Sequence, residues 1–329
     1  MRKMRAIRIE EAGGPDVLCV ASVPVPVPLE SEVLVRVEAA GVNRPDVLQR
    51  LGKYPLPPGA SPLPGLEIAG EVVELGNNAR RWSPGDRVMA LTHGGGYAEY
   101  CRVHEGHCLA IPENFTATMA AAIPETFFTV QYNLFMRAGL SAGETLLVHG
   151  GSSGIGTTAI QLANAKGAVV LATAGSDEKC RFCEKLGSAH AINYRSDDWV
   201  QKVSVLTDER GVDVVLDMVA GAYVQKNIEV LSRDGRYVII GFLQGWKAEV
   251  DFRPVLARRI TITGSLLRPQ TIEEKAAIAA SLQDEVMPLL ASGAVKPVIH
   301  ATFPLAQAAD AHRLMESSNH MGKIVLEVG

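Results

Sequence analysis

Cysteine is scarce in this sequence, and charges of opposite sign nearly balance. Five cysteines among 329 residues are an odd number in a long chain, which argues against a disulfide framework and indicates a reducing compartment. The 32 basic residues face 36 acidic ones and leave a formal charge of −4. That balance lacks the basic footprint of a nucleic-acid-binding protein.

Long hydrophobic runs are missing as well. No stretch approaches the roughly 18 uninterrupted apolar residues of a membrane-spanning helix. Near the N-terminus the segment Ala6–Ile9 is followed at once by Glu10 and Glu11, whereas a secretory signal needs about 7–15 apolar residues there. We therefore expect a cytoplasmic protein whose partners include neither a membrane nor nucleic acid.

The overall composition, with 47% hydrophobic and 21% charged residues, is typical of a globular chain. The length suggests about two domains. Residues 33–38 and 70–75 are β-rich runs bounded by turns rich in proline and glycine. Prolines at 24, 26 and 28 exclude a central strand over this segment, because proline lacks the backbone donor. The N-terminal part is predicted to be a β-barrel-like or irregular sheet domain.

The pattern changes near residue 116. Residues 116–138 are helix-like, with one break at Pro124, and residues 272–292 return to a helical pattern. Apolar strands are predicted at 145–148, 169–172, 212–216 and 237–240, helices at 155–165, 177–186 and about 222–231, and a separate last strand at 322–326. Apolar strands that alternate with helices predict a parallel sheet covered on both faces.

A glycine-rich segment, Val148–Gly156, lies between a predicted strand and a predicted helix, which is the context of a dinucleotide-binding loop. Glycine lets the backbone approach a pyrophosphate, and the helix N-terminus offers unpaired N–H groups to it. The Gly-Lys-Ser/Thr ending of nucleoside-triphosphate loops is missing, which argues against a kinase or an ATPase. We assign to the pyrophosphate the residues Ser152, Ser153, Gly154, Ile155 and Gly156.

An acidic residue is missing at the end of the second strand of this unit. An NAD site is expected to have one there, to accept a hydrogen bond from the ribose 2′-OH. The chain instead offers Ser176 and Lys179, a hydroxyl donor and a cation that suit a 2′-phosphate. Lys179 can also be a solvated helix residue, and Asp177 and Glu178 can be first-turn acids favoured by the helix dipole. The pattern favours NADPH.

Short motifs in a fixed order along almost the whole chain resemble one known family. They are Gly13–Leu18, Ala40–Asp46, Pro64–Glu67, Pro84–Val88, Pro124–Thr129, Thr173–Ser176, Asn193-Tyr194, Gly322–Leu326 and the glycine loop. The chain resembles the zinc-independent NADPH:quinone oxidoreductases of the medium-chain dehydrogenase/reductase superfamily, the group related to ζ-crystallin. This resemblance implies an α/β fold in which a Rossmann NADP(H)-binding domain, residues 127–267, is inserted into a GroES-like catalytic domain, residues 1–126 plus 268–329. It also implies a homodimer.

Zinc-dependent members of the superfamily hold a catalytic zinc with a cysteine, a histidine and a third cysteine or acid. The matching positions here are Asn43, Leu66 and Glu125. Leucine cannot bind a metal, and one carboxylate with one amide does not make a tetrahedral zinc site. The structural zinc lobe of four cysteines has no counterpart between residues 90 and 116. We expect no metal.

Two other cysteine patterns leave alternatives open. The segment Cys101–Cys108 contains two cysteines and two histidines, but alternation along a strand sends them to opposite faces. They could converge on a metal only through a sharp turn at Gly106. Cys180 and Cys183 lie one turn apart on a predicted helix, where they either pack against their neighbours or form a redox pair.

By resemblance, Asn43, Tyr54 and Thr129 lie near the nicotinamide and the substrate, where the amide and the phenol can donate hydrogen bonds. Asn43 can instead be a turn residue before Pro45, and Tyr54 can pack under neighbouring prolines. The same resemblance places Tyr194 beside Ser176 and Lys179 at the 2′-phosphate. It assigns to the nicotinamide end the residues Gly241, Phe242, Ser265, Leu266 and Leu267.

The implied function is hydride transfer from NADPH to a quinone without a metal, because a quinone is already a strong electrophile. One rival is reduction of an activated C=C bond, in an enone or an enoyl thioester. There Tyr54 would become the acid that supplies a proton. A rival of another class is an NADPH-binding structural or sensor protein.

Overall fold

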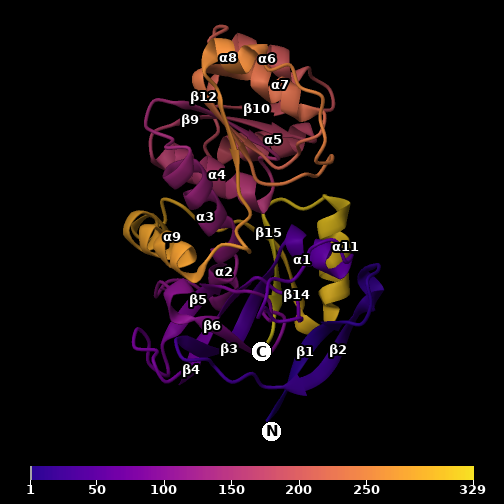
Figure 1. The fold of residues 1–329 in the computed structure, drawn as a ribbon, viewed down its shortest axis with the longest axis vertical. Helices are drawn as coiled ribbons and strands as arrows, with labels where there is room; N and C mark the ends of the chain where they lie inside the picture. The colour runs from indigo at the N-terminus through magenta and orange to yellow at the C-terminus, as the bar shows by residue number, and fades with distance from the viewer. Residues whose placement is uncertain (1) are drawn as a thin grey trace. The chain divides into compact units, whose positions relative to one another are not determined.

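The chain forms two compact units in the computed structural model, which describes residues 2–329 (Figure 1). One unit, called here the first unit, contains the chain up to Phe128 together with Leu267–Gly293 and Pro297–Gly329. The second unit contains Thr129–Leu266 and Ala294–Lys296. The chain therefore enters the second unit from the first and returns to it. The predicted α/β class is confirmed, with a doubly wound parallel sheet inserted into a β-rich unit.

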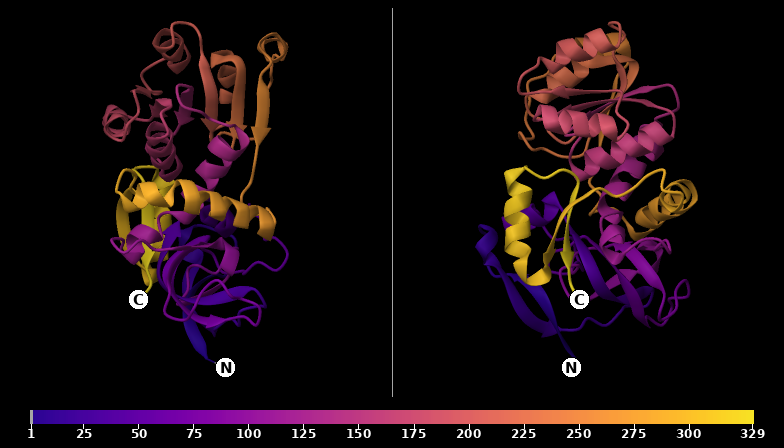
Figure 2. Two further views of the ribbon diagram at one scale, coloured as in Figure 1. Left: turned by 90° about the vertical axis from the view of Figure 1, so that its left-hand side faces the viewer. Right: turned by 180° about the vertical axis from the view of Figure 1, so that it is seen from behind.

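The first unit is built on a seven-stranded sheet with the order β14-β15-β3-β4-β5-β7, in which β6 also pairs with β3. The strands of this sheet are β3 (Glu32–Val42), β4 (Glu67–Leu75), β5 (Arg87–Leu91), β6 (Tyr100–His104), β7 (Cys108–Ala110), β14 (Ile299–Pro304) and β15 (Lys323–Glu327). The first unit also contains a separate hairpin made of β1 (Lys3–Ile9) and β2 (Leu18–Pro24). Strand β2 ends at Pro24, where the proline run begins. The C-terminal β15 pairs antiparallel with β3, so this sheet combines strands that precede the second unit in the sequence with strands that follow it (Figure 2).

Helices around this sheet are α1 (Arg44–Arg50), α2 (Ala117–Ala120), α9 (Ile272–Glu285), α10 (Met287–Ala291) and α11 (Ala308–Ser317), with α3 (Pro124–Val130) running into the second unit. Short 3-10 turns occupy Pro15–Val17, Glu105–His107 and Leu305–Gln307. The predicted helix 116–138 is divided into α2, α3 and a π-helical segment, Gln131–Arg137. Pro124 begins α3 rather than kinking a continuous helix, because proline has no N–H to give to a preceding turn.

The second unit holds a six-stranded sheet with the order β10-β9-β8-β11-β12-β13, and all of its neighbouring pairs are parallel. Its elements are β8 (Thr145–His149), α4 (Gly154–Ala165), β9 (Val169–Ala174), α5 (Asp177–Lys185), β10 (His190–Asn193), α6 (Trp199–Leu206), β11 (Val212–Asp217), α7 (Tyr223–Val230), β12 (Leu231–Ile239), α8 (Arg253–Arg258) and β13 (Thr261–Gly264). Helices cover both faces of this sheet, as the two views of Figure 2 show. From β8 the chain builds the sheet first toward β10 and then, on the other side, toward β13, so the direction reverses between β8 and β11.

Candidate functional site

The residues that we assigned to the cofactor follow the carboxyl ends of parallel strands in the second unit. The glycine loop follows β8, Ser176 follows β9, Tyr194 follows β10, Gly241 and Phe242 follow β12, and Ser265 and Leu266 follow β13. Open α/β sheets bind their ligands at this edge, beside the point where the strand order reverses. The fold therefore gathers these residues at one edge, although they lie far apart in the sequence. Leu267 comes next in the chain and belongs to the first unit.

Two glycines of the loop, Gly151 and Gly156, have no room for a Cβ. A Cβ at Gly156 would lie 2.3 Å from the carbonyl oxygen of Gly150, and one at Gly151 would lie 2.8 Å from the Cβ of Ala172. Ser153 caps α4, because its Oγ accepts a hydrogen bond from the N–H of Gly156 at 3.0 Å. A close-packed loop that ends at a capped helix N-terminus fits a pyrophosphate.

Lys179 and Arg195 follow the ends of β9 and β10, and the charge of Arg195 acts on Lys179. Ser176 caps α5 and accepts from the N–H of Lys179 at 3.3 Å. A Cβ at Gly175 would lie 2.8 Å from the Tyr194 hydroxyl and 3.6 Å from Nε of Arg195. Burial, and then the charge of Arg195, lower the pKa of Lys179. A lysine and an arginine whose charges act on each other suit a phosphate, because it can accept hydrogen bonds from both. Our sequence analysis missed Arg195, although it directly follows the Asn193-Tyr194 motif.

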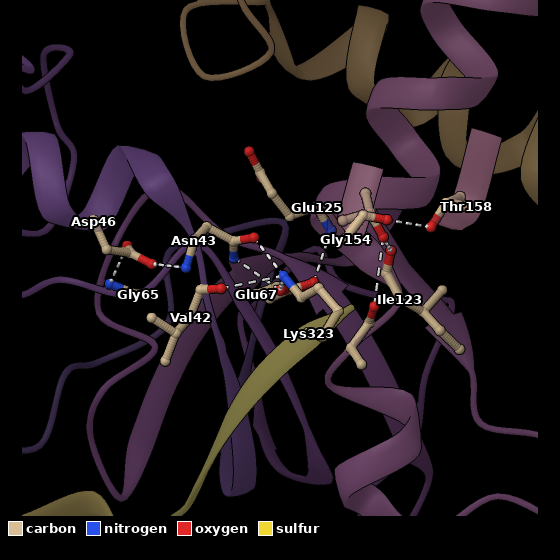
Figure 3. Close-up of polar contacts among 12 residues, drawn as sticks. Val42, Asn43, Asp46, Gly65, Glu67, Ile123, Glu125, Gly154, Thr158 and Lys323 are labelled. Atoms are coloured by element: carbon tan, nitrogen blue, oxygen red, sulfur yellow. Dashed lines mark hydrogen bonds and ion pairs between the residues drawn. The ribbon is translucent and has the colours of Figure 1, made fainter. Parts of the chain in front are cut away.

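In the first unit a buried polar cluster surrounds Asn43 (Figure 3). Asn43 caps helix α1 and donates from Nδ2 to Oε1 of Glu67 at 2.8 Å. Nζ of Lys323 donates to the same carboxylate oxygen at 2.6 Å and also to Oδ1 of Asn43. Oε2 of Glu67 accepts from the backbone N–H of Glu125 at 2.8 Å. Glu67, Asn43 and Lys323 are all buried, so this network fixes the Asn43 amide in one orientation.

Asp46 supports the cluster from the first turn of α1. Its carboxylate accepts from the backbone N–H of Asn43 at 2.9 Å, from that of Gly65 at 3.1 Å and from the Tyr97 hydroxyl at 3.1 Å. Burial raises the pKa of Asp46 to about 6, against the opposing effect of these hydrogen bonds. Tyr97 is in turn 3.3 Å from Nε2 of His312.

The positions at which zinc-dependent relatives bind their metal do not fit zinc here. The side-chain amide of Asn43 is hydrogen-bonded to Glu67 and Lys323, and Leu66 is a buried apolar residue. Burial, and next the charge of Glu67, raise the pKa of Glu125 to about 8. Its carboxyl group points away from Lys323 (Figure 3). Within residues 2–329, no three His, Cys, Asp or Glu side chains are grouped to hold a metal ion.

The other two candidate catalytic residues lie elsewhere. Tyr54 is in the long connection between α1 and β4, and its ring centroid is 5.2 Å from Cζ of Arg268. Burial raises the pKa of Tyr54 well above its usual value, so its hydroxyl remains a hydrogen-bond donor. Thr129 lies on α3 in the second unit, where its carbonyl accepts from Asn133 at 2.9 Å. Asn133 also accepts from the Ser265 hydroxyl at 2.8 Å.

The cysteine patterns have structural explanations. Cys101 and Cys108 belong to β6 and β7, separated by a 3-10 turn, and burial raises the pKa of both thiols. Cys180 and Cys183 are free thiols buried on α5, and burial raises the pKa of Cys183 to about 12. A reactive thiol needs a lowered pKa, whereas burial raises the pKa of these four thiols, which favours a packing role for them.

Comparisons with known proteins agree with this architecture. Residues 29–113 match the alcohol dehydrogenase GroES-like domain, and residues 154–282 match a family described as zinc-binding dehydrogenase. The chain is 35% identical to human quinone oxidoreductase over 326 residues, which covers 98% of this chain and 97% of that protein.

Within residues 2–329, no helix is both long and apolar enough to span a bilayer.

Two solved structures are also similar over nearly their full lengths. A mycobacterial protein complexed with NADPH is 30% identical, with a TM-score of 0.88, over 99% of this chain and all of that one. The CurK enoyl reductase is 29% identical, with a TM-score of 0.88, and both chains are covered completely.

Proposed function

This chain belongs to the quinone oxidoreductases of the medium-chain dehydrogenase/reductase superfamily, and from that premise we propose that it transfers hydride from NADPH to a quinone without a metal ion. The observation that carries the proposal is the lysine-held Asn43 amide, which stands where relatives have a zinc ligand. NADPH supplies the hydride when it is bound. The five free thiols suit a cytoplasmic protein.

The chain's own residues orient and polarise the reactants. Asn43 uses one amide hydrogen on Glu67 and keeps the second to donate to the acceptor oxygen, which becomes negative during transfer. The ring of Tyr54 offers a flat wall to a planar acceptor, and its hydroxyl is the proton donor that reduction of a C=C bond would use. We assign Thr129, Gly241, Phe242, Ser265, Leu266 and Leu267 to the nicotinamide end. Ser152–Gly156 hold the pyrophosphate.

Reduction of an activated C=C bond is the second candidate, favoured by the likeness to an enoyl reductase and by the protonated Tyr54. This reaction needs a proton at carbon, whereas hydroquinone oxygens take protons from water. We expect Tyr54→Phe to change kcat for 1,4-naphthoquinone less than threefold and kcat for a cyclic enone more than tenfold, if both are substrates. Steady-state NADPH oxidation measures both. A similar loss with the two acceptors would contradict the water-protonation mechanism. If NADPH binds but is not oxidised in the presence of either acceptor, the protein would instead be a structural or sensor protein.

We propose that Ser176, Lys179, Tyr194 and Arg195 bind the 2′-phosphate. Lys179→Gln and Arg195→Gln should each lower kcat/KM for NADPH by about tenfold, the effect of about 1.4 kcal/mol in binding. They should leave kcat/KM for NADH nearly unchanged, because NADH has no 2′-phosphate. Lys202→Gln, on α6, is the control. Equal losses with both cofactors, or a parent that prefers NADH, would rule out this assignment.

We further infer a homodimer, as the resemblance implies. Strand β13 is an edge of the parallel sheet, and Ile262 on it is 40% exposed. Exposed edges with apolar side chains are places where strands of a second chain can pair. Sedimentation velocity should give twice the mass of one chain, and Ile262→Lys should shift it toward the monomer. A parent that sediments as a monomer would refute the inference.

A further inference from the structure

Two buried cations in the first unit have no part in the hydride transfer described above. Arg268 is 5% exposed and Lys275, on α9, is 2% exposed. They are linked to each other, since Nζ of Lys275 donates to the carbonyl oxygen of Arg268 at 2.8 Å. Buried charged side chains are normally paired with an opposite charge.

The hydrogen-bond partners of these two side chains are neutral. Arg268 donates from Nη1 to Oε1 of Gln49 at 2.9 Å and from Nη2 to the carbonyl oxygen of His93 at 3.4 Å. Its Nε is buried and has no partner within residues 2–329. Lys275 donates a second hydrogen bond to Nε2 of His93 at 2.6 Å. Burial, and then the charge of Lys275, lower the pKa of His93 to about 4, so its ring accepts as a neutral base.

Three acids act electrostatically on these cations: Asp46 and then Glu125 on Arg268, and Glu125 and then Glu274 on Lys275. Within residues 2–329 none of the three forms an ion pair or a hydrogen bond with either cation. Glu125 acts electrostatically on both cations, but its own pKa is raised to about 8 by burial, so most of it is protonated at neutral pH. Burial also lowers the pKa of Lys275 to about 8 and that of Arg268 below its usual value. Within residues 2–329, these two desolvated cations and the unpartnered guanidinium N–H therefore have no direct ion-pair partner.

Tyr54 lies against this pair. Its ring packs on the Arg268 guanidinium, and it belongs to residues 51–66, a segment that contains neither helix nor strand. Long connections of this kind are frequent binding elements. An aromatic wall beside two buried cations suits a planar molecule that carries a negative charge.

We propose that Arg268 and Lys275 form an anion subsite beside Tyr54, which takes the carboxylate or phosphate of a planar, conjugated acceptor. This inference rests on the proposed function only in naming the ligand as the acceptor. The charged group would accept hydrogen bonds from the guanidinium and the ammonium, while the ring of the acceptor lies against Tyr54. Acceptors with an anionic substituent would then be preferred over neutral ones of the same shape.

Binding can be tested without turnover. By isothermal titration calorimetry, 2-naphthoate should bind the parent at least tenfold more tightly than 2-naphthamide, a neutral analogue of nearly the same shape. Arg268→Gln and Lys275→Met should each weaken naphthoate at least tenfold and leave naphthamide unchanged. Arg259→Gln removes an exposed arginine of the second unit and should change neither. A parallel titration with 2-naphthyl phosphate distinguishes a phosphate subsite from a carboxylate one by which anion binds more tightly.

Arg268→Lys and Lys275→Arg keep the charge and should retain naphthoate binding, which covers the case in which a neutral variant fails to fold. Equal binding of naphthoate and naphthamide to the parent would overturn the proposal, and so would unchanged naphthoate binding in folded Arg268→Gln. The proposed function fails separately, if 1,4-naphthoquinone is not reduced by NADPH. Naphthoate binding that depends on Arg268 would stand even then.

Discussion

Lys323→Met should lower the free energy of unfolding by about 3–5 kcal/mol, the range for breaking a buried ion pair by removing one partner. Lys323 and Glu67 are 4% and 0% exposed, and their charged groups are 2.6 Å apart. Without the ammonium, the Glu67 carboxylate stays in the interior with only neutral donors, the Asn43 amide and the Glu125 N–H. Urea denaturation followed by circular dichroism measures the loss.

The matched double variant separates lost charge from lost packing. Lys323→Met with Glu67→Gln removes both charges, and we expect it to be more stable than Lys323→Met alone. Arg259→Gln breaks an ion pair whose side chains are 58% and 57% exposed, and it should leave the unfolding midpoint unchanged. The explanation fails if the double variant is less stable than Lys323→Met, because the uncompensated carboxylate would then not be the cause.

Gly156→Ala should weaken NADPH binding by at least about 100-fold, which corresponds to about 3 kcal/mol. The new Cβ would lie 2.3 Å from the Gly150 carbonyl oxygen and 2.6 Å from the Gly151 Cα. Both obstacles are backbone atoms, so the loop has to move rather than a side-chain tip. The movement would also pull the Gly156 N–H away from the Ser153 cap, and lost caps cost about 1 kcal/mol.

Titration of NADPH fluorescence on binding gives this dissociation constant directly. Gly14→Ala is the control, because nothing lies within 4 Å of its Cβ and its φ of −66° suits alanine. It should bind NADPH as the parent does. Parent-like affinity in folded Gly156→Ala would show that the close contact of the loop is not what admits the pyrophosphate.

Local signals predicted the second unit well, because the information sits in short segments. The continuous apolar run of β8 is buried on both faces, and the glycine loop that follows it was recognisable from its spacing. The same signals failed where a break was subtle. One continuous helix is predicted over 272–292, but the structure contains two. Helix α9 ends at Glu285, and α10 begins at Met287 with a proline at its second position.

Two lysines that lie within apolar patterns of the sequence are weak signals of buried charge. Lys275 shares the apolar face of α9 with Ile278, Ala279 and Leu282, which recur at helical spacing. A lysine at that position is either exposed, if the buried face of the helix does not include it, or buried with a partner. The sequence does not distinguish these two cases. Lys323 opens an otherwise apolar strand, β15, in the same way.

The sequence by itself determined the family and the α/β class, and it predicted the phosphate loop and the residues at the positions of the zinc ligands. Only the tertiary structure decided that a buried lysine and a buried glutamate hold Asn43. Lys323 is 280 residues from Asn43 and 256 from Glu67, and they meet because β15 pairs with β3 and β3 with β4. Pairing between distant strands is set by the packing of the whole unit, and so is the burial that makes a lysine–glutamate contact strong. For the same reason Arg268 and Lys275 became candidates for a site only when their burial and their neutral partners were known.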